Sequence, residues 1–315
     1  MNTLTRRNFI TSTAAAGLVA ALPPLGAITP AVAPFRRHGQ ARLLLSLAAY
    51  SFRSFFPKMR GQPTDRMVAG GIPANRQMDM FKFIDFCREQ GCDGTELTTY
   101  FFDEETDDYM IRMRRHAYLN GIAVSGTAIG NNFSHPRGPK RDEEIATTKR
   151  WIDRAAALGT SHIRVFAGIA REISRAAADK LVISALEECC DYAGKKGIFL
   201  GLENHDSIGA ADTLLPMVKA VKSPWCGVNL DSGNFKTEDP YKDFAACIPY
   251  AVNVQFKTQL GRGSAGGVRN ADFRRLTKLL RDGGYQGWVA IEYEATDDPY
   301  VAVPRALAEL KQLFA

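Results

Sequence analysis

The sequence of 315 residues predicts a single (β/α)8 barrel, and three observations lead to this fold class. Short apolar, β-prone runs alternate with longer amphipathic stretches from Arg42 to the end of the chain. Several of the amphipathic stretches end at a glycine, which tolerates the left-handed conformation that closes a helix. No Gly-x-Gly-x-x-Gly motif follows the first β-prone run, so an open doubly wound sheet is the second choice.

The expected elements follow one another as repeated βα units. Strand starts lie 26 to 51 residues apart, which leaves room for a helix in each connection of a parallel sheet. Glycines close five of the expected helices, namely Gly91, Gly121, Gly159, Gly197 and Gly284. We expect strands at residues 43–49, 94–99, 122–128, 162–167, 198–203, 226–231, 252–257 and 288–292, and helices at residues 78–90, 109–120, 143–158, 176–196, 214–222 and 273–282.

Three connections are long and lack apolar periodicity. They are residues 53–77 after the first strand, 130–141 after the third and 259–270 after the seventh. Each follows the C-terminal end of a strand, which is the end of a barrel where enzymes of this architecture build their sites. We therefore expect these loops to surround a functional site.

The N-terminal segment, residues 1–33, resembles a twin-arginine export signal. Arg6 and Arg7 precede a Phe-Ile step and an alanine-rich apolar stretch that is too short for a stable membrane span. A chance arginine pair on a disordered tail is the alternative. Residues 31–33 offer small side chains for cleavage, but Pro34 should hinder the peptidase, so the cleavage position and an uncleaved anchor stay open. We expect an exported, periplasmic protein that uses the twin-arginine export machinery, with the barrel at residues 34–315.

Composition excludes several classes of protein. With 45% hydrophobic and 10% aromatic residues, the chain is not disordered as a whole. The net charge of +6 arises from 40 basic and 34 acidic residues, and the first 37 residues hold four arginines and no acid. Without them, 36 basic residues face 34 acidic ones, which excludes nucleic-acid binding through bulk charge. The six cysteines form no Cys-x-x-Cys pair, so we expect no zinc knuckle and no obligatory disulfide framework.

Polar side chains stand at the ends of the four last expected strands. A carboxylate at the end of a buried strand is costly unless it is paired, protonated or bound to metal. Three such groups at one barrel mouth would repel one another by several kcal/mol without a cation. The set suits Mn²⁺, Mg²⁺ or Co²⁺ better than a structural zinc ion. The alternative is that each acid caps a helix or pairs with Lys257 or Arg164. The four residues are Glu203, Asp231, Gln255 and Glu292.

The segments around these residues resemble the xylose isomerase-like TIM barrels, the sugar phosphate isomerase/epimerase family. They read Gly-Leu-Glu203-Asn-His, Asn-Leu-Asp231-Ser-Gly-Asn, Val-Gln255-Phe-Lys257 and Ala-Ile-Glu292-Tyr-Glu, and the resemblance covers the chain after Arg42. It implies that Glu203, Asp231, Gln255 and Glu292 are the metal ligands. Histidine is usual in place of Gln255, which is a weaker, neutral donor. Family members isomerise, epimerise, dehydrate and cleave, so the resemblance does not fix the reaction.

The resemblance implies a metal-dependent sugar isomerase or epimerase that removes a proton beside a metal-chelated carbonyl. Glu203 and Glu292 are the expected acid and base, and Glu294 lies on the same strand face as Glu292. His205 either donates a proton to the substrate or is a hydrogen-bonded wall residue. Lys257 either binds a substrate oxygen and moves protons, or forms a salt bridge to a nearby glutamate.

Further residues are expected to contact a carbohydrate. Arg164 lies inside an apolar strand and needs a carboxylate partner, either Glu96 or Glu203. Glu96 therefore either contacts the substrate or neutralises Arg164. Tyr50 could stack on a sugar ring, and Asn234 corresponds to a substrate-facing position of the family. Asn132 and His135 are weaker candidates on the loop after the third strand. A homo-oligomer is possible and is not decided by the sequence.

Three other functions stay open at this stage. A lyase or hydratase acting on oxidised sugars would use the same site. A non-catalytic exported sugar-binding protein is favoured by Gln255, and a search for a bound divalent ion would separate it from an enzyme. A DNA-repair endonuclease shares this barrel but needs a three-metal cluster rich in histidine, whereas this chain has five histidines, of which only His135 and His205 lie near expected strand ends.

Overall fold

The computed structural model describes residues 32–261, 263–264 and 266–315. The predicted export signal lies outside the described residues except for its last two positions, so export stays a prediction. None of the helices formed by the described residues combines the length and the apolar character that a membrane crossing needs.

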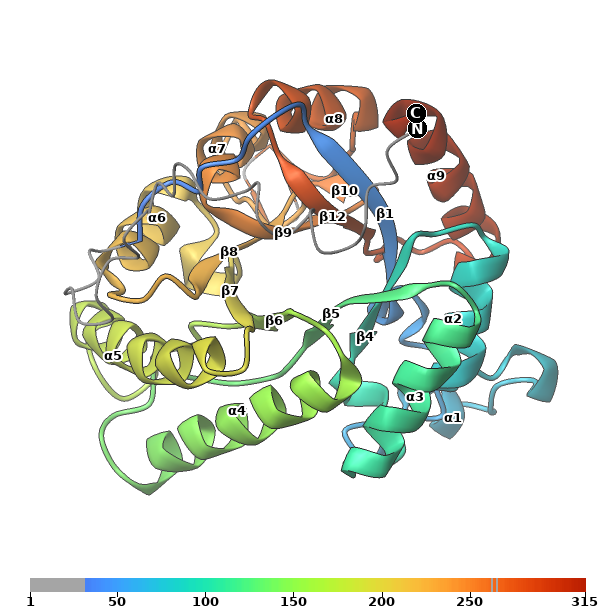
Figure 1. Ribbon diagram of the computed structural model, residues 1–315, viewed down its shortest axis with the longest axis horizontal. Helices are drawn as coiled ribbons and strands as arrows, with labels where there is room; N and C mark the ends of the chain where they lie inside the picture. Colours follow the sequence, from blue (N-terminus) through green and yellow to red (C-terminus); the bar gives the residue numbers. More distant parts are fainter. Residues whose placement is uncertain (1–31, 262, 265) are drawn as a thin grey trace, which may run out of the picture.

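Eight parallel strands close into a barrel, which confirms the predicted fold class and excludes the open sheet (Figure 1). Around the barrel the order is β1-β12-β9-β8-β7-β6-β5-β4. Each predicted strand is present, and its ends differ from the prediction by at most two residues. The strands are β1 (Arg42–Ala48), β4 (Gly94–Thr98), β5 (Ala123–Ala128), β6 (His162–Val165), β7 (Phe199–Glu203), β8 (Cys226–Asp231), β9 (Ala251–Phe256) and β12 (Gln286–Ile291).

Helices cover the outside of the barrel (Figure 1). The six predicted helices correspond to α2 (Met80–Glu89), α3 (Asp107–Leu119), α4 (Pro139–Leu158), α5 (Arg175–Gly194), α6 (Ala211–Ala220) and α8 (Phe273–Asp282). All five predicted closing glycines have positive φ, between 63° and 84°. At Gly159 this conformation lets the N–H donate to Ala155 O at 2.9 Å and end α4.

Besides the one-turn helix α1 (Asp65–Val68), two longer helices of the described residues were not predicted, α7 (Pro240–Cys247) and α9 (Pro299–Phe314). Each begins with proline directly after an aspartate, and that aspartate caps the helix. The Asp239 carboxylate accepts from the backbone N–H of Tyr241 at 3.1 Å, and Asp298 does the same for Tyr300 at 3.1 Å. The Asp-Pro pair was therefore the start signal that periodicity alone did not reveal.

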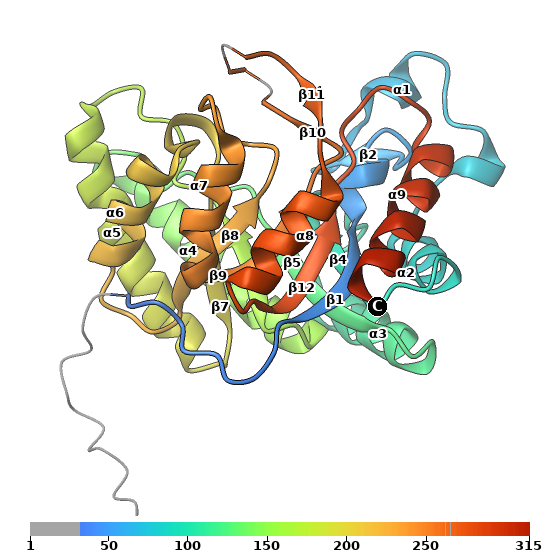
Figure 2. The ribbon, with the colours of Figure 1, turned by 90° about the horizontal axis from the view of Figure 1, so that it is seen from above.

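The long connections after the first and seventh barrel strands carry small elements of their own. The first contains β2 (Lys58–Met59), β3 (Gln62–Pro63) and α1 (Asp65–Val68). The second contains β10 (Gln259–Leu260) and β11 (Arg269–Asn270). Figure 2 shows both on the same side of the barrel, away from the chain segment that leads into β1. They rise around the C-terminal ends of the strands, where the candidate site lies.

Candidate functional site

A pocket of about 180 Å³ opens at the C-terminal mouth of the barrel. Seven of the residues singled out from the sequence line it, namely Tyr50, Arg164, Glu203, His205, Lys257, Glu292 and Glu294. Three lining residues were not predicted, namely Arg60, Tyr100 and Phe166. Phe166 directly follows β6 and Tyr100 is the second residue after β4, so the strand-end rule that found the acids would have found them too.

Glu203 ends β7 and is held from two sides. Its Oε2 lies 3.0 Å from Arg164 Nε, and its Oε1 accepts from Asn234 Nδ2 at 2.7 Å. Burial raises the pKa of Glu203 to about 7, a rise that the charge of Arg164 opposes and that of Glu292 reinforces. A carboxyl group with this pKa can gain or lose a proton at neutral pH.

Lys257 follows β9 and stands among three carboxylates. Its Nζ lies 3.1 Å from Asp231 Oδ2, 3.2 Å from Glu292 Oε1 and 2.9 Å from Glu294 Oε2. It also donates to Asn234 Oδ1 at 3.0 Å. Burial alone would lower the pKa of Lys257, but the facing acids raise it well above its ordinary value. Lys257 is therefore a charged ammonium group that can bind an oxygen atom and is no base at neutral pH.

Asp231 ends β8 and is fully buried. Its Oδ1 accepts from the backbone N–H groups of Gly233 at 2.7 Å and Asn234 at 3.1 Å, while its Oδ2 faces Lys257. Burial raises the pKa of Asp231 to about 7 against the opposing charge of Lys257. Asp231 therefore fixes the turn that carries Asn234 and forms an ion pair with Lys257 Nζ.

Beneath the pocket, four fully buried side chains form a closed ring of hydrogen bonds. Asn253 Nδ2 donates to Glu96 Oε2 and to Asn229 Oδ1, both at 2.8 Å. Asn229 Nδ2 donates to Gln255 Oε1 at 2.7 Å, and Gln255 Nε2 donates to Glu96 Oε1 at 2.6 Å. Both Glu96 oxygens accept in this arrangement, one from Asn253 and one from Gln255, which is the pattern of an ionised carboxylate. The Gln255 amide therefore turns its N–H toward the pocket, where it also donates to Glu292 Oε2 at 3.1 Å.

The structure places Glu96 in this ring and not on the pocket wall. Its side chain is fully buried, and burial together with the charge of Glu292 raises its pKa to about 7. The carboxylate that pairs with Arg164 is that of Glu203. Asn229 and Asn253 were missed, although each stands two residues before a singled-out residue on the same strand face.

The residues implied as metal ligands have suitable oxygen donors, but their arrangement does not fit a divalent ion. Lys257 Nζ lies in the space between Asp231 and Glu292, and the Gln255 carbonyl oxygen accepts from Asn229. Across the part of the chain that the structure describes, no group of three or more His, Cys, Asp or Glu side chains is arranged to hold a metal ion. The Mn²⁺, Mg²⁺ or Co²⁺ site stays a prediction that requires Lys257 to withdraw and Gln255 to turn over.

Aromatic and cationic side chains form the outer wall of the pocket. The Arg60 guanidinium lies 4.3 Å from the centre of the Tyr100 ring, and that of Arg164 lies 3.9 Å from the centre of Phe166. The His205 ring lies 4.7 Å from Phe166, and its Nδ1 lies 3.0 Å from an oxygen of the neighbouring Asp206. Rings that are held in this way offer flat apolar faces beside charged hydrogen-bond donors.

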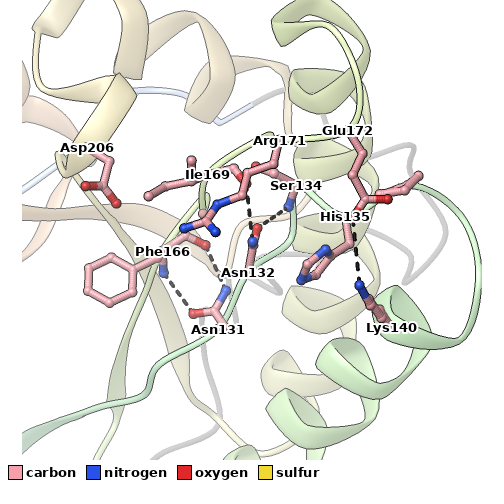
Figure 3. Close-up of a pocket in the computed structure, with 12 residues that line it drawn as sticks. Asn131, Asn132, Ser134, His135, Lys140, Phe166, Ile169, Arg171, Glu172 and Asp206 are labelled. Atoms are coloured by element: carbon pink, nitrogen blue, oxygen red, sulfur yellow. Dashed lines mark hydrogen bonds and ion pairs between the residues drawn. The ribbon is translucent and has the colours of Figure 1, made fainter.

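Asn132 and His135 do not line this pocket. They line a larger cavity of about 390 Å³ between the loops that follow β5 and β6 (Figure 3). This larger cavity therefore lacks the clustered acids. Phe166 lines both spaces, so the two pockets are neighbours.

Comparison with known proteins gives a family and a fold. The family model described as xylose isomerase-like TIM barrel matches residues 84–313. No curated protein matches the sequence.

Solved structures resemble the chain at low sequence identity. D-psicose 3-epimerase in the presence of D-fructose is 18% identical with a TM-score of 0.64, covering 84% of this chain and 89% of the other. The 3-keto-D-glucoside 4-epimerase of E. coli is 16% identical with a TM-score of 0.62, covering 87% and 100%. A xylose isomerase-like TIM barrel protein from Mycobacterium smegmatis in complex with magnesium is 18% identical with a TM-score of 0.63, covering 86% and 96%. Since the family model spans most of the barrel, this chain belongs to the xylose isomerase-like TIM barrel family.

Proposed function

We propose that this protein is a carbohydrate isomerase or epimerase that removes a proton from the carbon beside a carbonyl group. The observation that carries the proposal is the pair Glu203 and Glu292. They enter one pocket from β7 and from the end of β12, with β8 and β9 between them in the barrel order. Each is held by a different cation, Glu203 by Arg164 and Glu292 by Lys257.

Two carboxyl groups placed in this way can act from opposite sides of a bound sugar. One carboxylate takes the proton from the C–H bond, and the bonding electrons move onto the carbonyl oxygen to give an enediolate. The other, protonated carboxyl group returns a proton to carbon, on the opposite face for epimerisation or on the neighbouring carbon for isomerisation. Lys257 is a permanent positive charge at the pocket and can stabilise the oxygen anion.

The aromatic wall suits a carbohydrate ligand. Tyr50, Tyr100 and Phe166 offer apolar faces to the C–H groups of a sugar ring, while Arg60 and Arg164 offer N–H donors to its hydroxyl groups. Solved structures of the same fold bear the names of sugar epimerases, among them D-psicose 3-epimerase and L-ribulose 3-epimerase.

We include a divalent metal ion in the proposal because the site holds more acids than bases. Four buried carboxyl groups, those of Glu96, Glu203, Asp231 and Glu292, lie around the two buried cations Arg164 and Lys257. A related barrel is known in complex with magnesium. Glu203, Asp231 and Glu292 would hold the ion if Lys257 withdrew, Gln255 would join them only if its amide turned over, and a bound ion would supply Lewis-acid chemistry at the pocket.

To test the proposal, the protein is incubated with a series of keto-sugars in deuterated water. One set of samples contains EDTA and a parallel set contains Mn²⁺. NMR detects exchange at the carbon next to the carbonyl without knowledge of the product. We expect exchange for at least one sugar, together with its loss in Glu203→Gln and Glu292→Gln variants. Exchange accompanied by loss of a leaving group would identify the lyase alternative. If no sugar exchanges under either condition, the proposed proton abstraction is wrong.

A further inference from the structure

The larger cavity lies directly beside the candidate site. Residues after β5, β6 and β7 line its volume of about 390 Å³, against about 180 Å³ for the pocket with the two glutamates. Pockets that bind drug-sized ligands usually have about 300–1,000 Å³, so the smaller pocket alone is small for more than one sugar unit. The two spaces meet at Phe166, which lines both.

The side chain of Phe166 lies between the two pockets, and its backbone is held in place by hydrogen bonds. Asn131 holds its backbone at both polar groups: Asn131 Nδ2 donates to Phe166 O at 2.8 Å, and Phe166 N donates to Asn131 Oδ1 at 2.9 Å (Figure 3). The ring itself packs against Arg164 and His205. A ligand that reaches from one pocket into the other would therefore contact a Phe166 ring that is already in place before the ligand binds.

Close approach of the two loops also requires a glycine. Gly168 has φ +88°, and a Cβ atom there would lie 1.9 Å from Asn132 Oδ1 and 2.8 Å from Asn132 Cα. The second contact is with backbone, so the loop could not yield by a rotamer change. The wall of the larger cavity therefore depends on a glycine at position 168 beside Asn132, and neither residue takes part in the proposed proton transfer.

The charges lining the larger cavity balance. Lys140 and Arg171 face Glu172 and Asp206, and Lys140 Nζ lies 3.8 Å from Glu172 Oε1. Figure 3 shows the Arg171 side chain directed toward Phe166, and no other described residue provides it with a hydrogen-bond or ion-pair partner. A phosphate or carboxylate ligand would call for an excess of positive charge, whereas balanced charges suit a neutral ligand with many hydroxyl groups.

Polar and apolar groups alternate on the remaining wall. Asn132 and Ser134 supply amide and hydroxyl groups, and Ile169, an exposed residue, supplies an apolar surface. Sugars have the same mixture of hydroxyl groups and apolar C–H faces.

We propose that the larger cavity is a subsite for a second sugar unit, so that the substrate is a disaccharide or a glycoside with a sugar-like aglycone. The reacting unit lies between Glu203 and Glu292, the glycosidic bond passes Phe166, and the second unit contacts Arg171. This inference rests on the proposed function because it extends the same site.

The experiment compares matched saccharide pairs by calorimetry. D-Fructose is paired with lactulose and with maltulose, in which the same keto unit carries a second sugar, so that only the second unit differs. For wild type we expect at least one of these disaccharides to bind tenfold or more tightly than D-fructose. Arg171→Ala should bring that ratio close to one and leave the affinity for D-fructose unchanged. Arg150→Ala, which removes an exposed arginine from the outer surface of α4, is the matched control and should leave both affinities unchanged.

Three results would overturn the proposal that the larger cavity binds a second sugar unit. Equal affinities within every pair show that the second unit makes no contact. Equal weakening of both members by Arg171→Ala shows that Arg171 acts at the smaller pocket. If no saccharide of either pair binds, the subsite is also wrong, and the keto-sugar exchange screen then decides whether the proposed function fails with it or stands for a monosaccharide.

Discussion

Replacing Lys257 with methionine tests whether a cation is required among the acids at the barrel mouth. The substitution keeps the length of the side chain and removes its charge. In wild type the ammonium group lies within 3.2 Å of oxygen atoms of Asp231, Glu292 and Glu294, and the Lys257 side chain is 8% exposed. Removing one partner from a buried ion pair costs about 3–5 kcal/mol, because the remaining charge is left without compensation. We expect Lys257→Met to lose that much stability in metal-free buffer.

Divalent metal should reverse this loss if the same acids can hold an ion. A ligand that binds only the folded state at about 100 times its Kd adds ~2.7 kcal/mol to the free energy of unfolding. We expect Mn²⁺ to stabilise Lys257→Met by such an amount, and to bind it more tightly than wild type, in which Lys257 competes for the same oxygen atoms. Urea unfolding with EDTA and with Mn²⁺, together with calorimetric titration, measures both effects.

Lys222→Met is the matched control, because Lys222 is exposed on the loop that leads into β8. It should change neither stability nor metal affinity. The reasoning is refuted if Lys257→Met is as stable as wild type in EDTA, since the lysine would then not be neutralising the acids. A large stability loss that Mn²⁺ does not reduce would refute the metal part alone.

Four other substitutions have defined outcomes. Glu203→Gln and Glu292→Gln should each slow hydrogen–deuterium exchange at the substrate carbon by on the order of 10²- to 10⁴-fold and stay slow at saturating Mn²⁺, and recovery of both by metal would place the base elsewhere. Gln255→His should tighten Mn²⁺ binding if this position is a ligand, because imidazole is the stronger donor; an unchanged calorimetric affinity would place residue 255 outside the ligand set. Burial lowers the pKa of His162 from 6.5 to about 3, so its contribution to stability is complete above pH 6.5 and falls at lower pH. Between pH 7 and pH 5.5, wild type should lose about 1 kcal/mol more than His162→Leu in urea unfolding, and equal losses would contradict the buried, neutral histidine.

The barrel could be predicted because its signals are local. Alternation of apolar runs and closing glycines located the eight strands to within two residues. The same logic failed for α7 and α9, which begin at Asp-Pro pairs that a search for periodicity does not weigh. Strand ends also located the acids, because all parallel strands of a barrel end at one mouth.

The ring beneath the pocket could not be derived from the sequence, because it depends on the register between neighbouring strands. β8 and β9 pair Asn229 with Asn253 and Asp231 with Gln255, and the register shifts between Val228 and Asn229. Without that shift, different residues would face one another. The sequence shows that Gln255 stands at a strand end. It does not show that the Gln255 oxygen faces Asn229 and its nitrogen faces Glu96 and Glu292.

The distribution of charge gives the two glutamates different surroundings. Arg164 forms an ion pair with Glu203, and the guanidinium stays charged across the physiological pH range. In this pair one positive charge therefore faces one carboxylate. Lys257 is shared by the buried acids Asp231 and Glu292, so these two carboxylates are not neutralised one to one. Positive charge brought to the site, whether a metal ion or a proton, is therefore most strongly favoured beside Lys257 and not beside Arg164. Since the Gln255 amide directs an N–H toward Glu292, the ring beneath the pocket adds a hydrogen bond on that same side and holds the glutamate in place while the charge around it changes.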